Sequence, residues 1–325
     1  MTGAKRLETI RCIVFAGGGV KGVAYCGALM AMESWCGIRD GVGGPNAPRS
    51  LPNLRVAAGC SVGAIFAVMS ALNVRGASIV SLYENEDLIG LATPEMGMAA
   101  VRRLASNFGL DPGQGLRAAI QRMLQLGLQP WGKSQMADAI TLQELQTLCG
   151  IEVHCSTICV GHASGCGPAA AGGWDRVTLL TPCTHPTMSV LDAVHMSAAV
   201  PLVYEPCVYQ ARWYVDGAVI LNAPCAHLPP DETLLFTMDN DSSTSGASAR
   251  LFDYIMALLM AATFWIQESV VVRYAHQVRI RCTSIATVDF RASTLALRMG
   301  VLEGVVSTFM WMSKNCACPR FSTVV

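Results

Sequence analysis

Short apolar runs alternate along the chain with longer stretches in which apolar residues recur at helical spacing. The short runs are rich in β-branched residues and are bounded by Gly, Pro or polar clusters, so they predict strands, whereas the longer stretches predict helices. The predicted strands cover residues 11–16, 54–58, 151–160, 176–180, 213–215, 233–238 and 278–282. The predicted helices cover 20–35, the stretch after Gly59 through 72, 190–199, 250–275 and 294–313, and a helical, irregular region covers 78–149. Thr141 and Glu144 form a capping box that opens the last helix of that region.

Strands that alternate with helices and are apolar on both faces are typical of a sheet that is covered on both sides. The pattern therefore predicts an α/β fold with a central, mostly parallel sheet sandwiched between helices. No internal repeat and no linker interrupts the pattern. We expect one domain at 11–313, with an N-terminal tail at 1–10 and a C-terminal tail at 314–325.

The composition excludes some classes of protein. Hydrophobic residues make up 52% of the 325 residues, charged residues make up 14%, and the formal net charge is zero. A disordered chain needs low hydrophobicity and high charge, and nucleic-acid binding usually leaves a basic footprint. Residues 56–74 carry no charge, but their glycines and serines fit a strand, a turn and a buried helix better than a membrane span. We expect no transmembrane helix.

The chain has 14 cysteines, and its first residues lack the apolar core and cleavage pattern of a secretory signal peptide. We therefore expect reduced, mostly buried thiols in a cytoplasmic protein. Cys155, Cys159, His162 and Cys166 have a spacing that zinc sites permit but do not favour. Because Cys155 and Cys159 fall on one face of a predicted strand, we expect no metal site.

The segment Gly59-Cys60-Ser61-Val62-Gly63 lies between a predicted strand and a predicted helix. A G-x-S-x-G motif in this context places a serine on a sharp turn, with its hydroxyl above the sheet. Glycines flank the serine because side chains there would clash with the neighbouring strand and helix. The motif alone does not separate a nucleophile from an ordinary tight turn.

A glycine-rich loop, Gly17-Gly18-Gly19-Val20-Lys21-Gly22, joins the first predicted strand to a helix. It fits the dinucleotide-binding pattern G-x-G-x-x-G, but the next strand has no acidic residue at its end to hold a ribose. It is not a P-loop, because the Gly-Lys-Ser/Thr ending is missing. Its unpaired backbone N–H groups can still bind an anion or an oxyanion. The positive charge of Lys21, in the first turn of the predicted helix, is unfavourable with the helix dipole. Lys21 is therefore either a solvated lysine that tolerates this small penalty or a residue that supports an anionic group, such as the oxyanion loop or a phosphate headgroup.

A serine nucleophile needs a base. In the order of α/β-hydrolase triads, His227 or His276 can follow Asp216, yet neither lies in a distinctive motif. His195 fits a packed or surface histidine. Alternatively Asp216, at the end of a predicted strand, is itself the base within hydrogen-bond reach of the serine. Partial desolvation would raise its basicity, and Gly217 leaves room for close approach.

Together these segments resemble the patatin-like phospholipase family, whose motifs are G-G-G-x-[KR]-G, G-x-S-x-G and D-G-[GA]. All three occur in the family's order, and the resemblance covers roughly residues 11–305. Residues 193–201 are similar to the family's A-x-x-A-S-x-A-x-P helix end, with Met196 in place of an alanine, and Asn222-Ala223-Pro224 is similar to its N-x-P. Ala218 replaces the commonest second glycine of the aspartate motif and leaves the carboxylate intact.

The resemblance implies a lipid acyl hydrolase of phospholipase A type, with a Ser61–Asp216 dyad and an acyl-serine intermediate. The implied oxyanion hole is Gly17, Gly18 and Gly19, and the implied supporting residues are Lys21, Gly22, Gly59, Gly63 and Gly217. It implies no metal and no cofactor. The substrate would be a membrane phospholipid or another lipid ester. Triacylglycerol lipase, lysophospholipase, transacylase and a non-catalytic lipid-binding protein remain as alternatives.

We expect the acyl chain to lie against the helix at 252–274, which is apolar on nearly all sides and is therefore buried or faces lipid. We expect a cytoplasmic protein that associates peripherally with membranes and binds no nucleic acid. A protein activator stays open as a partner. The short glycine loop is similar to that of family members from bacteria and large viruses, some of which act in a host cell.

Overall fold

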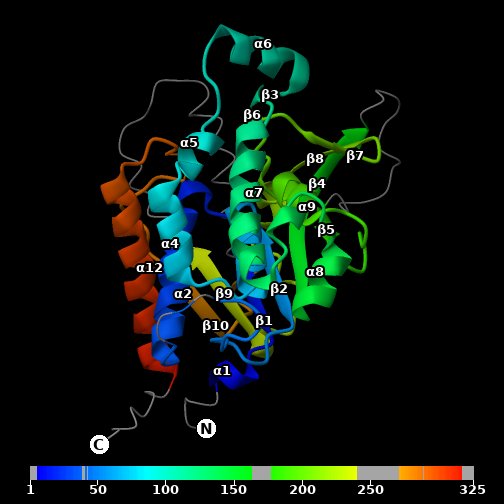
Figure 1. Ribbon diagram of the computed structural model, residues 1–325. Coiled ribbons are helices and arrows are strands. Elements are labelled where there is room, and N and C mark those ends of the chain that lie inside the picture. Colours follow the sequence, from blue (N-terminus) through cyan, green and yellow to red (C-terminus); the bar gives the residue numbers. More distant parts are fainter. Residues whose placement is uncertain are drawn as a thin grey trace, which may run out of the picture.

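The computed structural model describes residues 6–38, 41, 43–162, 177–239, 271–287 and 289–316. Its centre is an eight-stranded sheet, with helices packed against it (Figure 1). The strands are β1 Cys12–Phe15, β2 Val56–Cys60, β4 Glu152–His162, β5 Val177–Leu180, β7 Cys207–Tyr209, β8 Arg212–Asp216, β9 Thr233–Met238 and β10 His276–Ile280. The five strands in the order β10-β9-β1-β2-β4 are all parallel, and β5, β7 and β8 add antiparallel pairings.

The strand β4 is long enough to pair with two strands along one edge. β2 pairs with residues 152–156 of β4 in parallel, and β8 pairs with residues 157–162 in the antiparallel direction. The other edge of β4 is occupied by β5 at residues 155–158. Since a residue in a sheet has one neighbour on each edge, β2 and β8 must lie end to end on the same edge. Their carboxyl ends therefore meet beside the middle of β4, within the sheet.

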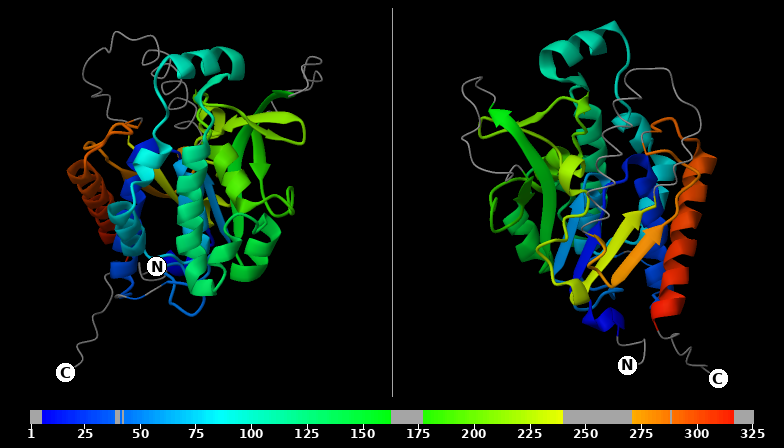
Figure 2. Two further views of the ribbon diagram at one scale, coloured as in Figure 1. Left: turned by 45° about the horizontal axis from the view of Figure 1, so that its top comes forward. Right: turned by 180° about the vertical axis from the view of Figure 1, so that it is seen from behind.

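Most of the described helices cover one face of the sheet, as the views in Figure 2 show. They are α2 Ala24–Trp35, α3 Val62–Ala71, α4 Gly76–Asn85, α7 Gln114–Leu128, α9 Val190–Ala198 and α12 Thr294–Asn315, and the main hydrophobic core lies beneath them. A smaller core on the opposite face contains Ala223, Cys225, Leu228, Val271 and Tyr274. The shorter helices are α1 Arg6–Thr9, α5 Leu88–Ala92, α6 Met98–Asn107, α8 Leu142–Cys149 and α10 Ala218–Leu221. The predicted α/β fold, with a central, mostly parallel sheet flanked by helices, is confirmed.

Several element boundaries differ from the sequence prediction. The helix predicted at 20–35 starts as a tight 3₁₀ turn, η2 Gly19–Val23, before α2 begins. A small second sheet pairs β3 Gly109–Asp111 with β6 Leu202–Tyr204, and neither three-residue strand shows a periodic pattern. The capping box at Thr141 is confirmed, because its hydroxyl accepts from the Glu144 N–H while the Glu144 carboxylate accepts from the Thr141 N–H. The helix predicted at 250–275 lies almost entirely outside the described residues.

The predicted tails contain ordered structure. Residues 1–10 include α1, and Leu7 and Ile10 are buried in the main core. α12 continues to Asn315. Among the described helices, α12 alone is long and apolar enough to cross a membrane by length and composition. Packed helices of soluble proteins meet the same criterion, so this finding carries no conclusion about the membrane.

The cysteines that the structure describes are free thiols. Cys155 is buried, and its β4 neighbour Cys159 is partly buried. Cys166, the last member of the weak zinc pattern, lies outside the described residues. Within the described residues, no group of three or more His, Cys, Asp or Glu side chains is arranged to hold a metal ion.

The helices α2 and α12 are in backbone contact. A Cβ atom on Gly304 would lie 1.9 Å from the Ala24 carbonyl oxygen, and one on Gly27 would lie 1.9 Å from the Val301 oxygen. Gly300, one turn before Gly304, faces side chains instead: its Cβ would approach the Ile285 Cδ1 atom at 2.8 Å. Two glycines therefore set the separation of these helices.

We predict that Gly304→Ala lowers the free energy of unfolding by about 1–3 kcal/mol, because two backbones must move apart. Gly300→Ala is the matched control. There the Ile285 side chain can move, and the higher helix propensity of alanine, about 0.5–1 kcal/mol, offsets the strain. Denaturant unfolding of both variants checks this, and equal stability of the two would show that the helices do not depend on this contact.

Candidate active site

Ser61 occupies the turn between β2 and α3. Its φ and ψ angles are 56° and −129°, a conformation that a non-glycine residue adopts only at a cost of about 1–3 kcal/mol. The residue is 5% exposed. Two hydrogen bonds to Ser197 fix the turn, because the Ser61 N–H donates to the carbonyl oxygen of Ser197 (3.1 Å) and to its hydroxyl (3.0 Å). Such strain at the end of a strand is the geometry of a nucleophile elbow.

The four predicted supporting glycines stand at positions where there is no room for a side chain. A Cβ atom at each position would lie 2.1–2.5 Å from a neighbouring atom, below any real contact distance. The nearest atoms are the Gly63 oxygen for Gly59, the Phe15 oxygen for Gly63, the Val62 Cγ2 for Gly22 and the Ser156 oxygen for Gly217. The first turn of α3 can therefore lie directly against the end of β1 and beside the glycine-rich loop.

Asp216 is the last residue of β8, and the end-to-end placement of β2 and β8 brings it to Ser61. Its Cα is level with Thr157 of β4, and β2 ends at Cys60, level with Ser156. The Asp216 carboxylate is 2% exposed. It accepts hydrogen bonds from the Ala218 N–H (2.7 Å) and from the Cys60 thiol (3.4 Å), and the Ser61 side chain is near enough to lower its pKa.

Burial raises the pKa of Asp216 to about 6, although the neighbouring Ser61, Ala218 and Cys60 lower it in part. The desolvated carboxylate is therefore a stronger base than an ordinary aspartate and is still mostly ionised at neutral pH. Ala218, which departs from the commonest family pattern, begins the helix α10. It is not among the residues with positive φ, so alanine fits there without strain.

The helix end at residues 193–201 explains a second motif. The Ser197 hydroxyl accepts from the Ser61 N–H and donates to the Ser156 carbonyl oxygen of β4 (2.7 Å). The carbonyl oxygen of Ala199 accepts from the Asp216 N–H (2.8 Å). The end of α9 thus fixes the backbones of both the candidate nucleophile and the candidate base. Sequence reasoning quoted this segment only as a resemblance and missed its role, as it missed the Cys60 contact.

The glycine-rich loop lies beside Ser61. The Gly17 N–H donates to the Asn222 carbonyl oxygen (3.1 Å), and the Asn222 amide donates to the Gly17 oxygen (3.3 Å). The N–H groups of Gly18 and Gly19 have no acceptor within the described part of the chain. Of the three oxyanion donors expected from the family resemblance, Gly17 already donates its N–H to Asn222, and Gly19 lines the cavity beside Ser61.

Lys21 does not point into the solvent. Its side chain is 8% exposed, and its charge lowers the pKa of the Cys282 thiol, which burial raises to about 12. This places the lysine near the end of β10 and the start of α12. The structure thus excludes the alternative of a solvated lysine.

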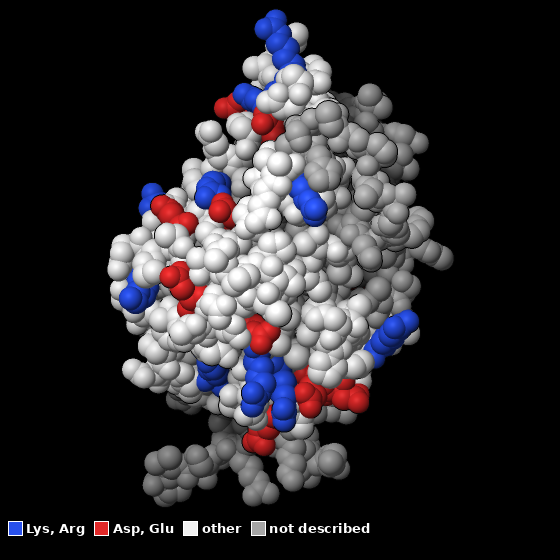
Figure 3. Space-filling model, turned by 90° about the vertical axis from the view of Figure 1, so that its right-hand side faces the viewer, with Lys and Arg blue, Asp and Glu red and all other residues white. Residues whose placement is uncertain are grey.

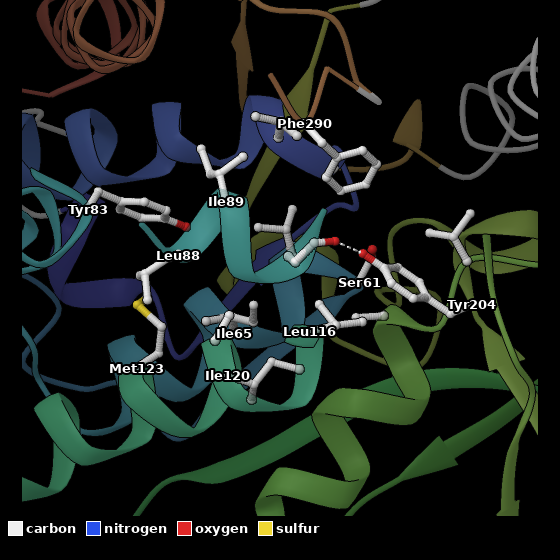
Figure 4. Close-up of a pocket in the computed structure, with 17 residues that line it drawn as sticks. Ser61, Ile65, Tyr83, Leu88, Ile89, Leu116, Ile120, Met123, Tyr204 and Phe290 are labelled. Atoms are coloured by element: carbon white, nitrogen blue, oxygen red, sulfur yellow. Dashed lines mark hydrogen bonds between the residues drawn. The ribbon is translucent and has the colours of Figure 1, made fainter. Parts of the chain in front are cut away.

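An apolar cavity opens beside Ser61 (Figure 4). Its volume is about 100 Å³, and it is partly open to solvent. Ser61, Leu116 and Tyr204 lie toward one end, and Tyr83 and Met123 lie toward the other. The lining comes from η2, α3, α4, α5, α7, α9, β6 and nearby loops: Gly19, Val20, Ser61, Val62, Ile65, Tyr83, Leu88, Ile89, Ala92, Leu116, Ala119, Ile120, Met123, Ala198, Val200, Tyr204 and Phe290. The site therefore joins a serine hydroxyl to an apolar cavity large enough for part of a hydrocarbon chain.

The acyl trough was predicted on the helix at 252–274, which lies outside the described residues. Within the described part of the chain, α3, α5 and α7 line the cavity instead. Sequence reasoning left residues 78–149 as an irregular helical region. Apolar residues at helical spacing in α7, such as Leu116, Ile120 and Met123, were the available signal.

No histidine lines the cavity around Ser61 among the described residues. His227 contacts the His154 ring (2.9 Å) near the start of β4, and His276 is the first residue of β10. Both therefore lie toward the amino ends of strands that run parallel to β2, whereas Ser61 follows its carboxyl end. His195 contacts the Cys207 thiol (3.5 Å), and burial lowers its pKa to about 4. Asp216 is the carboxylate that lies beside Ser61 among the described residues.

We predict a pH-dependent stability difference between the wild type and Asp216→Asn. A carboxyl whose pKa is raised from 3.8 to about 6 by folding stabilises the protein below pH 4, and this stabilisation is lost as the pH rises through 6. Relative to the wild type, the variant should gain about 3 kcal/mol of unfolding free energy between pH 4 and pH 7. Denaturant unfolding across this range measures the gain, and a pH-independent difference would show that Asp216 titrates normally.

The chain is similar in sequence to one known protein family and in fold to several solved structures. The model of a family described as patatin-like phospholipase matches residues 13–228. A search of curated protein sequences gave no significant match. Among solved structures, VipD from Legionella pneumophila is similar, with a TM-score of 0.57, 15% sequence identity, and coverage of 94% of this chain and 67% of VipD.

The type III effector ExoU is also similar, with a TM-score of 0.47, 13% identity, and coverage of 94% of this chain and 53% of ExoU. A complex of ExoU with SpcU from Pseudomonas aeruginosa matches with 17% identity, a TM-score of 0.47, and coverage of 94% of this chain and 52% of that chain. The chain thus spans about two thirds of VipD and about half of ExoU. The family model covers most of the sheet, the Ser61 turn and Asp216, and the chain belongs to the patatin-like phospholipase family, whose members hydrolyse lipid esters.

Proposed function

We propose that the protein hydrolyses acyl esters of membrane phospholipids with Ser61 as nucleophile and Asp216 as general base. The observation that carries the proposal is a strained, buried Ser61 that lies beside a desolvated carboxylate and lines an apolar cavity. A turn with a structural role alone has no need of a buried acidic partner. Family membership supports the same class of reaction.

Acylation starts when the Ser61 hydroxyl attacks the ester carbonyl carbon and gives its proton to Asp216. The negative charge that develops on the carbonyl oxygen is stabilised by the open N–H groups of Gly18 and Gly19 at the start of η2. When the tetrahedral intermediate collapses, the bond to the leaving alcohol breaks. Protonated Asp216 returns its proton to that alcohol, and the acyl group stays on Ser61.

Deacylation repeats these steps with water. Asp216 takes a proton from the water as the water oxygen attacks the acyl carbon, and the Ser61 oxygen then leaves and recovers the proton. Fatty acid is released. The Cys60 thiol and the Ala218 N–H keep the carboxylate oriented through both half-reactions. No step needs a metal or a cofactor.

The apolar cavity supports a lipid acyl chain as the group that is transferred to Ser61, because its lining offers almost no polar partner for a sugar or a peptide. Triacylglycerol lipase, lysophospholipase and transacylase activities use the same site and the same intermediate. A non-catalytic lipid-binding role is the alternative from another class, and the intact dyad argues against it. We propose a peripheral membrane location in the cytoplasm, a host cytoplasm if the chain is an effector, and we leave a protein activator open.

We predict that a fluorophosphonate probe labels the wild type on Ser61 and that the protein releases fatty acid from mixed phospholipid vesicles. Ser61→Ala abolishes both. Asp216→Asn should lower both by about two to four orders of magnitude, the range of general base catalysis. Mass spectrometry of the labelled peptide and fatty-acid release measure these effects.

Asp192→Asn is the matched control, because Asp192 pairs with Arg117 and does not line the cavity. It should keep wild-type labelling and release. A folded wild type that neither labels nor hydrolyses would favour the binding role. Equal losses in Asp192→Asn and Asp216→Asn would show that Asp216 acts through stability alone.

We also predict that Ala119→Phe selects against long acyl chains. Ala119 lies on α7 and lines the cavity, so a phenyl ring there shortens the space that a fatty acyl chain can fill. Hydrolysis of a long-chain ester should fall at least about tenfold relative to a short-chain ester, because several buried methylenes are worth about 0.8 kcal/mol each. The ratio of kcat/KM for acetyl and palmitoyl esters of one alcohol measures the effect. An unchanged ratio would place the acyl chain elsewhere.

A further inference from the structure

A protrusion rises from the end of the molecule that carries the Ser61 cavity. This α6 protrusion, residues 94–108, contains α6 and stands at the top of Figure 1, whereas the two chain termini lie at the opposite end. It follows α5 directly. Its exposed side chains include Met96 (66%), Met98 (74%), Val101 (57%) and Phe108 (50%).

The helix α6 does not bury all of its apolar side chains: Ala100 is buried and Leu104 is partly buried, but Met98 and Val101 are exposed. Arg103 and Asn107 face the body of the protein: the Arg103 guanidinium donates to the Leu110 oxygen (2.9 Å), and the Asn107 amide donates to the Glu205 carboxylate (2.9 Å). Met98 and Val101 face outward. A surface helix in water normally buries its large apolar side chains, so the exposed Met98 and Val101 are suited to an apolar surrounding.

The base of the protrusion is fixed. The Glu95 N–H donates to the Asp111 carboxylate (2.9 Å), β3 pairs with β6 immediately after α6, and the Phe108 ring packs on the Trp213 ring with centroids 5.3 Å apart. The exposed apolar side chains therefore project from a segment whose base is fixed to the rest of the protein.

The protrusion is continuous with the mouth of the cavity. Ile89 and Ala92 of α5 line the cavity, and Leu91 on the same helix is 42% exposed. The Tyr204 hydroxyl, from the cavity wall, donates to the Ala92 oxygen. One short helix thus carries apolar side chains both into the cavity and out onto the surface that leads to Met96.

The charges of the protrusion favour an anionic surface. Arg103 is neutralised by Glu95 and Glu205. Arg102 is exposed and has no ion-pair partner within the described residues. Figure 3 shows basic atoms at the topmost tip of the molecule, and paired acidic and basic atoms just below it. An unpaired arginine among exposed methionine and valine side chains fits a lipid interface, where the charged end can reach the headgroups.

We infer that the α6 protrusion is an interfacial anchor that inserts Met96, Met98 and Val101 into a lipid bilayer and seats the mouth of the Ser61 cavity on it. The inference rests on the proposed function in one respect, because it assumes that the acyl chain enters from the membrane. An ester chain leaving the bilayer then passes along Leu91 and Ala92 without crossing water.

Flotation of the full chain with phosphatidylcholine vesicles, with and without phosphatidylglycerol, tests the anchor. The double variant Met98→Glu/Val101→Glu should lower the vesicle-bound fraction of the protein at least about tenfold and lower vesicle hydrolysis in parallel. The reason is that two charges replace apolar groups that would otherwise insert into the bilayer. Labelling of Ser61 by the soluble fluorophosphonate should be unchanged, which shows an intact fold and site. Arg102→Ala should weaken binding only to vesicles that contain phosphatidylglycerol.

The matched control is Leu302→Glu/Val306→Glu, the same change on the exposed face of α12 away from the cavity mouth. It should bind vesicles as the wild type does. Wild-type binding by the α6 variant, or no vesicle binding by the wild type, overturns the anchor. A wild-type dimer that the α6 variant converts to monomers, with vesicle binding retained, makes this face a contact between copies and also overturns it. Flotation of Ser61→Ala tests the anchor even if the proposed hydrolysis fails.

Discussion

The meeting of β2 and β8 on one edge of β4 is the constraint on which the site depends. Two strands that run in opposite directions share that edge, so the residue after one and the last residue of the other come together. Residues 61 and 216 are thereby brought into contact without an insertion or a flexible arm. The motif at the end of α9 reinforces this junction, because Ser197 holds the backbone at Ser61 and Ala199 holds that at Asp216.

Two features that cost free energy of folding lie close together at this junction. Ser61 has a backbone conformation that is costly for a residue with a Cβ atom, and Asp216 carries its carboxylate into an almost dry site. The surrounding glycines admit the close backbone approach, and the aromatic cluster of Phe15, Tyr25, Phe66 and Phe236 supports the end of β1 from below. The Tyr25 hydroxyl also donates to the Ala16 oxygen, directly before the glycine-rich loop (2.7 Å). The stable core under the site compensates for the strain within it.

The sequence predicted the parts of the molecule whose signals are local. The strand runs, the Thr141 cap and the G-x-S-x-G turn each depend on neighbouring residues, so the fold class and Ser61 could be predicted. The choice of Asp216 over a histidine needed the family resemblance, since strand pairing over 155 residues leaves no local pattern. The use of the Gly17 N–H by Asn222, the inward course of Lys21 and the cavity lining by α5 and α7 depend on tertiary contacts. No periodicity could have shown them.

The long separation between the two reacting residues has a consequence for the newly made chain. Ser61 belongs to the early unit β1-η2-α2-β2-α3, whose contacts are close in sequence, but Asp216 arrives only when β8 docks on the far half of β4. Contacts between distant residues generally form late in folding. A nascent chain that ends before β8 therefore has Ser61 without the carboxylate that we propose as its base. If Ser61 and Asp216 act as proposed, synthesis of the chain separates the appearance of the nucleophile from the onset of lipid hydrolysis.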